Sequence, residues 1–316
     1  MSKNFKIFLL AILTVFSIVL ATFAIDFDSL KLVQMSDIHL SHKEGNSGSR
    51  LYKHSYQLFE AAVKQTNAIK GVDAVVFSGD YSNRARVDDL EAFAEIANKL
   101  NEPWYMAPGN HDIGVCGGLS KKKFMEVLTK ANKYLPSSNI YYAVVPKPGY
   151  LLVFLDGTTD KIITATGYFP TEQLNWLDKT LSEHSNKKVI IVQHFPLYPP
   201  FSSMTHFVIN KQEYLDVINK HNNVIAILSG HYHGTKVTVV NNVAHISTPS
   251  GVQYPNAFRL LTFKDNGDKI QISSKMYETS LKNLQNLSKK SSRSPSTHYG
   301  KESDRNFTIE LKNNVK

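Results

Sequence analysis

Short apolar runs alternate with amphipathic stretches along most of this chain, and this alternation limits the fold more than any other feature of the sequence. The runs at residues 73–77, 188–192 and 224–228 are almost entirely apolar. Such runs are typical of strands that are buried on both faces of a sheet. Amphipathic helices are predicted between the runs, at about 54–69, 87–100, 121–134 and 211–222, and from Pro170 onward. This order predicts an α/β fold in which helices cover the central strands.

Further strands are predicted from short apolar runs and turn residues. Two are expected at residues 30–35 and 104–107, and a hairpin is expected at 141–145 and 150–155. A closing β-meander, interpreted as a second sheet, is predicted at 236–240, 243–247, 258–263 and 269–273. No linker interrupts this pattern, so residues 25–275 are predicted to be one domain. Residues 276–316 are basic, rich in serine and asparagine and poor in apolar residues, and they are predicted to be a flexible tail.

The N-terminus has the features of a secretory signal peptide. Lys3 and Lys6 precede an uncharged apolar run that ends at Ala24, with Thr22 and Ala24 at the −3 and −1 positions for cleavage. We therefore expect residues 1–24 to be removed and the protein to be extracytoplasmic, either secreted or periplasmic. The run is nearly long enough to span a bilayer, so a membrane anchor formed by residues 7–24 is the alternative.

Charge and cysteine content exclude two classes of interpretation. The net charge of +9 includes +2 from Lys3 and Lys6 and +4 from residues 276–316, where eight basic residues stand against four acidic ones. Only +3 remains for residues 25–275, so a nucleic-acid-binding surface is not supported. The single cysteine, Cys116, cannot form an internal disulfide and is interpreted as a small buried hydrophobic residue.

Five of the apolar runs are each followed by side chains that can bind a metal. Ligands bind at the carboxyl ends of strands in open α/β sheets, so we expect these side chains to meet at one edge. A solvated turn would explain any one of these groups by itself, but five coincidences are hard to explain without a metal. The side chains are Asp37 and His39, then Asp80, then Asn110 and His111, then His194, and finally His231 and His233.

Such a set is too large for one metal ion. Mixed imidazole, carboxylate and amide donors suit Zn, Mn or Fe in a two-metal site. The two pairs with i, i+2 spacing would place both side chains on the same side of an extended segment. Glycines beside Asp80, Asn110 and His231 would allow close backbone approach. The other histidines are expected to be ordinary surface or core residues: His42, His54, His184, His206, His221, His245 and His298.

As a set, these motifs resemble the calcineurin-like metallophosphoesterases. The resemblance rests on Asp37-x-His39, Gly79-Asp80, Gly109-Asn110-His111-Asp112, His194 and Gly230-His231-x-His233, in the order of that family. Residues 167–177 (Gly-Tyr-Phe-Pro-Thr-Glu-Gln-Leu-Asn-Trp-Leu) are similar to its cyclic-nucleotide phosphodiesterase-like branch.

The resemblance implies a fold and a ligand set. The fold would be a four-layer α/β/β/α sandwich of two mixed sheets. One metal would be bound by Asp37, His39, Asp80 and His233, and the second by Asn110, His194, His231 and the shared Asp80. Purple acid phosphatases have a metal-binding tyrosine at the position of Asn83, which makes a tyrosinate-iron site doubtful here and leaves Asn83 as a candidate contact to substrate phosphate. Tyr81 is displaced from that position by two residues.

Two metal ions beside two carboxylates suit a phosphate ester. A metal-bridging hydroxide would attack phosphorus, with His111 as the general acid for the leaving oxygen and Asp112 orienting its imidazole. The expected function is an exported phosphodiesterase that acts on a small-molecule or lipid phosphate ester, with 3′,5′-cyclic nucleotides among the candidates. A secreted phosphomonoesterase and a phospholipid head-group phosphodiesterase are the alternatives. The intact ligand set argues against a non-catalytic scaffold. The loop at 41–50 and the segment 204–210 are expected to shape specificity.

Overall fold

The computed structural model describes residues 29–113, 119–136, 138–161 and 164–315. The predicted signal peptide at residues 1–24 and the predicted buried thiol of Cys116 lie outside these ranges. Among the described residues, each helix is too short or too polar to cross a membrane.

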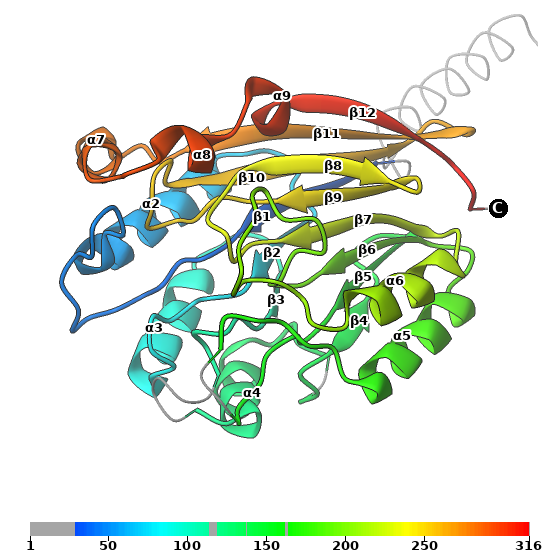
Figure 1. The fold of residues 1–316 in the computed structure, drawn as a ribbon, viewed down its shortest axis with the longest axis horizontal. Helices are drawn as coiled ribbons and strands as arrows, with labels where there is room; N and C mark the ends of the chain where they lie inside the picture. Colours follow the sequence, from blue (N-terminus) through cyan, green and yellow to red (C-terminus); the bar gives the residue numbers. More distant parts are fainter. Residues whose placement is uncertain (1–28, 114–118, 137, 162–163, 316) are drawn as a thin grey trace, which may run out of the picture.

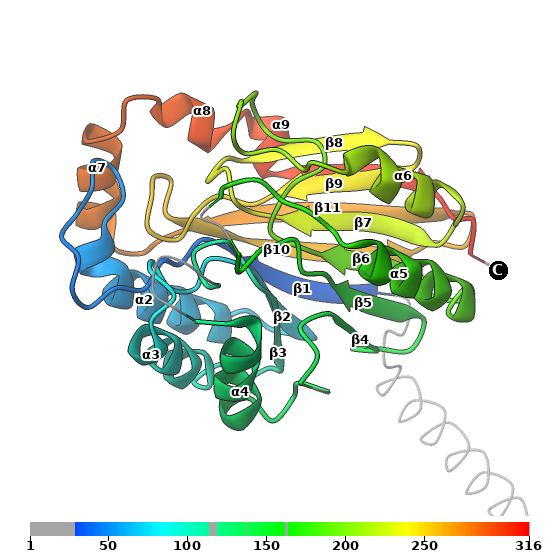
Figure 2. The same cartoon turned by 60° about the horizontal axis from the view of Figure 1, so that its bottom comes forward.

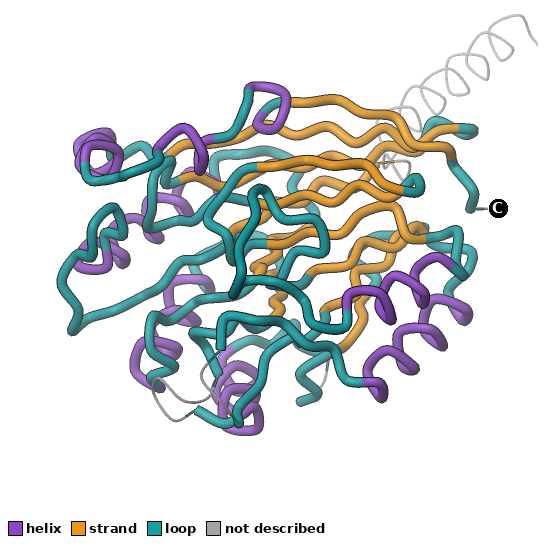
Figure 3. The backbone as a smooth tube through the Cα atoms, in the orientation of Figure 1, coloured by secondary structure: helices purple, strands orange, loops and turns teal. Residues whose placement is uncertain are grey.

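The strands form two six-stranded sheets (Figures 1 and 3). The first sheet has the order β12 (Phe307–Lys312), β11 (Lys269–Glu278), β10 (Ala257–Asp265), β1 (Ser29–Met35), β2 (Ala74–Ser78) and β3 (Trp104–Ala107). The second has the order β4 (Tyr142–Val144), β5 (Tyr150–Phe154), β6 (Lys188–Val192), β7 (Val224–Ser229), β9 (Val243–Ser247) and β8 (Lys236–Val240). Each sheet contains a set of neighbouring parallel strands, namely β1, β2 and β3 in the first and β5, β6, β7 and β9 in the second.

Helices cover the outer face of each sheet (Figures 1 and 2). One apolar cluster packs three helices against the first sheet: α2 (Ser55–Asn67), α3 (Val87–Ala97) and α4 (Lys121–Ala131). A second cluster packs α5 (Thr171–Glu183) and α6 (Lys211–Asn219) against the second sheet. A third cluster lies between the two sheets. The predicted four-layer α/β/β/α sandwich is therefore confirmed.

The parallel strands are mostly apolar because both of their faces are buried. In β2, Val75 and Phe77 pack under the helices, whereas Ala74 and Val76 face the second sheet. Successive side chains of a strand point to opposite faces, so a strand in an inner layer needs apolar residues on both faces. The predicted hairpin is also confirmed, because β4 and β5 pair antiparallel.

The closing strands do not form a meander within one sheet. β8 and β9 extend the second sheet from β7, whereas β10 and β11 extend the first sheet from β1. The strands themselves were predicted correctly, but their assignment to a common sheet was wrong. An apolar pattern identifies a buried strand but does not identify the sheet that the strand joins. Here residues 248–256 connect β9 in the second sheet to β10 in the first, and this connection has no apolar pattern that could be recognised.

The predicted flexible tail is also wrong. Residues 280–315, called the C-terminal segment from here on, contain α7 (Lys282–Lys290), α8 (Pro295–Tyr299), α9 (Glu302–Arg305) and β12. Figure 2 shows the three helices following one another along one side of the molecule, in orange and red. β12 pairs antiparallel with β11, so the domain extends to Lys312.

Polar contacts hold much of the C-terminal segment in place. The fully buried guanidinium of Arg259 in β10 donates to the backbone oxygens of Asp304 at 2.7 Å and Arg305 at 3.2 Å. The backbone N–H of Tyr254 donates to Ser288 Oγ at 2.7 Å. A segment that is ordered by hydrogen bonds more than by apolar burial resembles a disordered one in composition, which explains the incorrect prediction.

Candidate metal centre

The predicted metal-binding side chains all meet at the carboxyl ends of parallel strands. Figure 3 shows a broad region of loops at this end of the sheets. Asp37 and His39 follow β1, Asp80 follows β2 and Asn110 follows β3 in the first sheet, while His194 follows β6 and His231 and His233 follow β7 in the second. We call these seven residues the metal centre.

Two overlapping groups in the metal centre could each hold an ion. One consists of Asp37, His39, Asp80 and His233, and the other consists of Asp80, His194 and His231. Within each group the candidate ligand atoms lie within 4.8 Å of one another, and every residue is buried. The amide oxygen of Asn110 lies 3.2 Å from His194 Nε2, so it adds a donor to the second group. Asp80 is common to both groups.

The imidazole nitrogens of the metal centre face one another. His39 Nε2 lies 3.1 Å from His233 Nε2, and His194 Nε2 lies 3.1 Å from His231 Nδ1. Because Nδ1 of His194 and Nε2 of His231 each face a backbone oxygen and must carry the ring proton, two unprotonated nitrogens meet at the second contact, and such buried, facing lone pairs favour a bound cation. The donor set fits Mn, Fe or Zn.

Five residues of the metal centre have a left-handed backbone conformation. The φ angles are 52° at Asp37, 46° at His39, 58° at Asp80, 70° at His231 and 52° at His233. Non-glycine residues adopt this region rarely, and such strain is concentrated at functional sites. The i, i+2 pairs do converge as predicted, but through tight turns and not through an extended segment.

Two glycines allow the loops to approach closely. A Cβ atom at Gly79 would lie 2.7 Å from Cγ of His194 and 2.9 Å from Cα of Gly109. A Cβ atom at Gly109 would lie 2.9 Å from Cγ of Asp80. Any side chain at either position would therefore push the metal-binding loops apart, as the sequence predicted.

Burial and mutual charge set the protonation of the metal centre. Burial lowers the pKa of His39 and His231 well below the ordinary value, which keeps both imidazoles neutral and able to bind a metal. Burial also opposes protonation of His194, but the nearby Asp80 carboxylate raises the pKa of His194 to about 9. For Asp80, burial favours the neutral acid, and the surrounding histidines outweigh it and lower the pKa well below its usual value.

Hydrogen bonds fix the orientation of three ligand imidazoles. Nδ1 of His194 contacts the backbone oxygen of Ser78 at 2.8 Å, and Nε2 of His231 contacts that of Ala165 at 2.8 Å. Nδ1 of His233 contacts Oε1 of Gln253 at 2.7 Å. Such contacts fix the tautomer and turn the other ring nitrogen toward the metal. Gln253 was not predicted, because it lies beyond β9 in a loop without a recognisable motif.

His111 lies beside the metal centre and belongs to neither candidate group. Its ring makes an edge contact with the ring of His39, at 4.7 Å between centroids. Nδ1 of His111 lies 2.8 Å from the backbone oxygen of Asn83. The Asn83 carbonyl therefore orients the imidazole, and Nε2 remains for another contact. Asn83 itself is buried, at 6% exposure.

Asp112 does not orient His111, contrary to the prediction. Its carboxylate accepts four backbone N–H groups, from Asp80 at 2.8 Å, Tyr81 at 2.7 Å, Ser82 at 3.0 Å and Gly109 at 2.8 Å. A short polar side chain in a turn often binds the backbone nearby, and here it ties the loops after β2 and β3 together. The position of Asp112 next to His111 in the sequence could not show whether its carboxylate binds the imidazole or the backbone.

Tyr81 points away from the metal centre. Its hydroxyl donates to the backbone oxygens of Phe77 and Ala107, and its ring packs against Phe93 at 4.6 Å between centroids. The doubt about a tyrosinate ligand agrees with this position, because the Tyr81 ring is part of the core under α3.

A cavity of about 260 Å³ opens beside the metal centre, and we call it the side cavity. His231 and His233 form one wall, and Arg50, His206 and His298 contribute to the others. His206 and His298, which the sequence predicted to be ordinary surface or core histidines, therefore lie beside the metal centre. Arg50 ends the 41–50 loop, and His298 lies in α8, where the sequence predicted a flexible tail.

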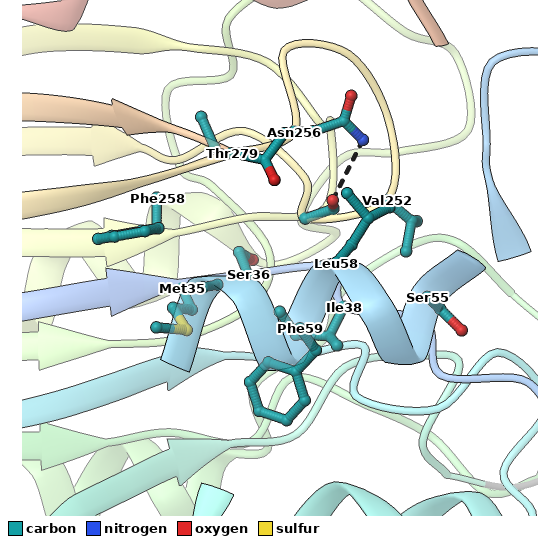
Figure 4. Close-up of a pocket in the computed structure, with 13 residues that line it drawn as sticks. Met35, Ser36, Ile38, Ser55, Leu58, Phe59, Val252, Asn256, Phe258 and Thr279 are labelled. Atoms are coloured by element: carbon teal, nitrogen blue, oxygen red, sulfur yellow. Dashed lines mark hydrogen bonds between the residues drawn. The ribbon is translucent and has the colours of Figure 1, made fainter. Parts of the chain in front are cut away.

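A separate, much smaller cavity is lined in part by Ser36 and Ile38, the sequence neighbours of Asp37 (Figure 4). It has about 20 Å³, room for one water molecule, between the end of β1 and α2. Its lining is mainly apolar and includes Met35, Leu58 and Phe59. Asn256 borders it and donates from Nδ2 to the backbone oxygen of Gly251 at 3.2 Å. This cavity is too small and too apolar to receive a phosphate ester.

Comparison with known proteins gives the chain a family. The sequence model of the calcineurin-like phosphoesterases matches residues 30–235, more than half of the 316-residue chain. The protein belongs to this family. The resemblance drawn from the motifs is therefore confirmed, and this calcineurin-like phosphoesterase is a metal-dependent hydrolase of phosphoric esters whose buried Asp/His cluster fits two metal ions.

Curated relatives include phosphodiesterases and a diphosphatase. The chain is 24% identical to a probable glycerophosphodiester phosphodiesterase of Arcobacter nitrofigilis, over 69% of this chain and 77% of the relative. It is 24% identical to a manganese-dependent ADP-ribose/CDP-alcohol diphosphatase of Mus musculus, over 64% and 75%. It is 27% identical to a probable cyclic nucleotide phosphodiesterase of Moraxella catarrhalis, over 65% and 72%.

A solved structure has the same fold. It is a dimetal phosphatase from Danio rerio, with a TM-score of 0.64 and 18% identity. The match covers 79% of this chain and 99% of that chain.

Proposed function

We propose that this calcineurin-like phosphoesterase is an exported phosphodiesterase that acts on small phosphodiesters. The observation that carries the proposal is the side cavity, which is continuous with two metal-centre imidazoles, His231 and His233. A phosphodiester bears two esterified groups, and the side cavity offers a place for the second one. The glycerophosphodiester and cyclic nucleotide phosphodiesterases among the relatives support the same class of substrate.

Each metal has a proposed ligand set. One ion is assigned to Asp37, His39, Asp80 and His233, and the other to Asn110, His194, His231 and the shared Asp80. The division into two buried groups supports this assignment. Bound there, the two ions would acidify water for attack on phosphorus and balance the charge that develops in the transition state.

The protein side chains have separate tasks in the proposed reaction. His111 protonates the leaving oxygen from Nε2, while the backbone oxygen of Asn83 accepts from Nδ1 and stabilises the imidazolium. The Asn83 side chain is proposed to contact substrate phosphate. Asp112 acts through the backbone, by holding the loops that carry Asp80 and Asn110.

The proposal is tested by reconstituting the protein with Mn, Zn or Fe. Activity is then compared on bis(p-nitrophenyl) phosphate, glycerophosphocholine, cyclic AMP and p-nitrophenyl phosphate. Higher kcat/KM on at least one diester than on the monoester is expected. A strong preference for p-nitrophenyl phosphate would instead establish the phosphomonoesterase alternative. A preference for glycerophosphocholine would favour a head-group phosphodiesterase.

Export is proposed from the N-terminal sequence alone. Cell fractionation should place the protein outside the cytoplasm, and N-terminal sequencing of the mature form should begin at Ile25. An intact N-terminus in the membrane fraction would establish the anchor formed by residues 7–24, and a soluble cytoplasmic form would refute export.

A further inference from the structure

The side cavity is basic and aromatic. Its lining contains Arg50 and four histidines, and none of the lining residues is acidic. Two aromatic rings, Phe201 and Tyr232, meet edge to face at 5.1 Å between centroids and form an apolar part of the wall. A space with this composition is poorly suited to a cation and well suited to an anion attached to an organic group.

Arg50 is held in place within the side cavity. Its Nε donates to Oε1 of Gln253 at 3.2 Å, and its Nη1 donates to the hydroxyl of Tyr52 at 3.4 Å. Both partners are neutral, and among the described residues no carboxylate lies within ion-pairing distance of Arg50. Two other arginines of the same region, Arg84 and Arg86, both pair with Glu44 at 3.1 and 3.0 Å. Arg50 therefore presents a positioned charge whose partner would come from a ligand.

The histidines of the side cavity differ in what they can donate. His298 is fully engaged, because Nδ1 contacts the backbone oxygen of His233 at 3.2 Å and Nε2 contacts Nε2 of Gln253 at 3.1 Å. In His206, Nδ1 contacts the hydroxyls of Ser203 at 3.0 Å and Thr205 at 2.8 Å, which leaves Nε2 for the cavity. Arg50 and His206 are thus two basic side chains of the side cavity with nitrogens left for an anion, and the ring of His206 lies 4.9 Å from that of His231.

We propose that the substrate carries a second anionic group, a phosphate or a carboxylate, which binds Arg50 and His206 while the scissile phosphate lies at the metal centre. This inference rests on the proposed phosphodiesterase function and specifies its substrate class. The second anion belongs to the group that extends from the scissile phosphate past His231 and His233. A guanidinium favours planar, bidentate contact with a phosphate or carboxylate. The aromatic part of the wall would pack against the organic portion between the two anions.

The experiment uses three diesters that differ only in the second anion. They are thymidine 5′-(p-nitrophenyl phosphate), the same ester with a 3′-phosphate, and the same ester with a 3′-O-carboxymethyl group. With the metal-loaded enzyme, kcat/KM should rise about 10- to 100-fold when the phosphate or the carboxylate is present, as expected for a charge-assisted hydrogen bond. Comparison of the two esters that carry a second anion then distinguishes a phosphate site from a carboxylate site.

Arg50→Met tests whether Arg50 causes the preference. The ratio of kcat/KM for an ester with the second anion to that for the ester without it should fall most of the way to one in this variant, which leaves only the contribution of His206. Arg50→Lys should retain part of the preference, and Arg84→Met, the matched control on an arginine already paired with Glu44, should keep the full ratio. Metal content is measured in each variant, because Arg50 contacts Gln253.

Two results would separate the possible failures. If the enzyme hydrolyses all three esters equally, or if Arg50→Met keeps the preference of the unmodified protein, the second-anion site is refuted and the phosphodiesterase proposal stands. If the metal-loaded enzyme hydrolyses none of the diesters but cleaves p-nitrophenyl phosphate, the proposed function itself fails.

Discussion

Among the single residues, His111 is the one proposed to transfer a proton without binding a metal. It touches the ring of His39 and hydrogen-bonds to the Asn83 carbonyl, yet it belongs to neither metal-binding group. His111→Ala should therefore keep both metal ions and lose about a hundredfold or more in kcat, because a general acid contributes that much to a rate. Metal content by inductively coupled plasma mass spectrometry and turnover on bis(p-nitrophenyl) phosphate are the two measurements. Loss of metal in this variant would make His111 a ligand.

Asp112 provides a contrast to His111. Its two carboxylate oxygens accept four backbone N–H groups, so Asp112→Asn would set an amide N–H₂ against two of those donors. Loss of about two charge-assisted hydrogen bonds should destabilise the fold by roughly 3 kcal/mol or more. We expect a lower thermal unfolding temperature and weaker metal binding in this variant. If it instead kept metal and stability and lost only turnover, the orienting role predicted from the sequence would be right.

His245 in β9 makes stability depend on pH. Burial lowers the pKa of His245 to about 4, with a further contribution from Lys211. The unfolded chain binds a proton at this histidine below about pH 6.5, whereas the folded protein does not until about pH 4. Stability is therefore complete above pH 6.5 and is lost as the pH falls through this window.

His245→Phe should remove that dependence. Between pH 7 and pH 5 the unmodified protein should lose about 2 kcal/mol more unfolding free energy than the variant. Urea unfolding of both proteins at the two pH values measures the difference. His54→Gln, a change at a half-exposed histidine that directly precedes α2, should behave like the unmodified protein. Equal losses in His245→Phe and the unmodified protein would contradict the prediction.

Among the structural elements, the loop after β9 and helix α8 support the metal centre from behind. Gln253 accepts from Nδ1 of His233 and also contacts His298, so the C-terminal segment reaches a metal ligand through one amide. Gln253→Ala should weaken metal binding by about 10- to 100-fold, as is typical when the partner of a ligand imidazole is removed. Titration of the apo protein with Mn²⁺ measures this directly. Gln57→Ala, a change on the exposed side of α2, is the control and should leave the affinity for Mn²⁺ unchanged. Equal affinities in the two variants would show that Gln253 does not support metal binding by His233.

The same elements show what could be predicted from the sequence. Asp37, Asp80 and His194 were found because each follows a predominantly apolar strand, and parallel strands bring their carboxyl ends to one edge. Gln253 and Arg50 could not be found this way, because both lie in loops whose route depends on tertiary contacts. The C-terminal segment was missed because polar contacts with Arg259 and Ser288 order it, and composition alone does not reveal such contacts.

For the whole molecule, the metal centre joins the two sheets. Asp37, His39, Asp80 and Asn110 come from the first sheet, and His194, His231 and His233 come from the second. Direct contacts already cross this boundary, among them the hydrogen bond from the backbone N–H of His231 to the Asp37 carboxylate at 3.1 Å and the contact of His194 Nδ1 with the Ser78 oxygen at 2.8 Å. Bound ions would therefore act as links between the halves of the sandwich, and the energy of metal binding would also be energy of folding.

Chelation should loosen the sandwich at the end that holds the metal centre. With Mn²⁺ at about 1,000 times its dissociation constant, the bound protein should gain about 4 kcal/mol over the chelated form, which corresponds to roughly 10 °C in the unfolding temperature. Hydrogen exchange should increase on chelation in the loops after β2, β6 and β7, and it should change little at β11 and β12 on the far edge of the first sheet. Asp80→Asn, which removes the carboxylate shared by both groups, should lose most of the stabilisation by Mn²⁺. A uniform increase in exchange over both sheets would contradict local loosening. It would mean that loss of the metals promotes global unfolding of the domain.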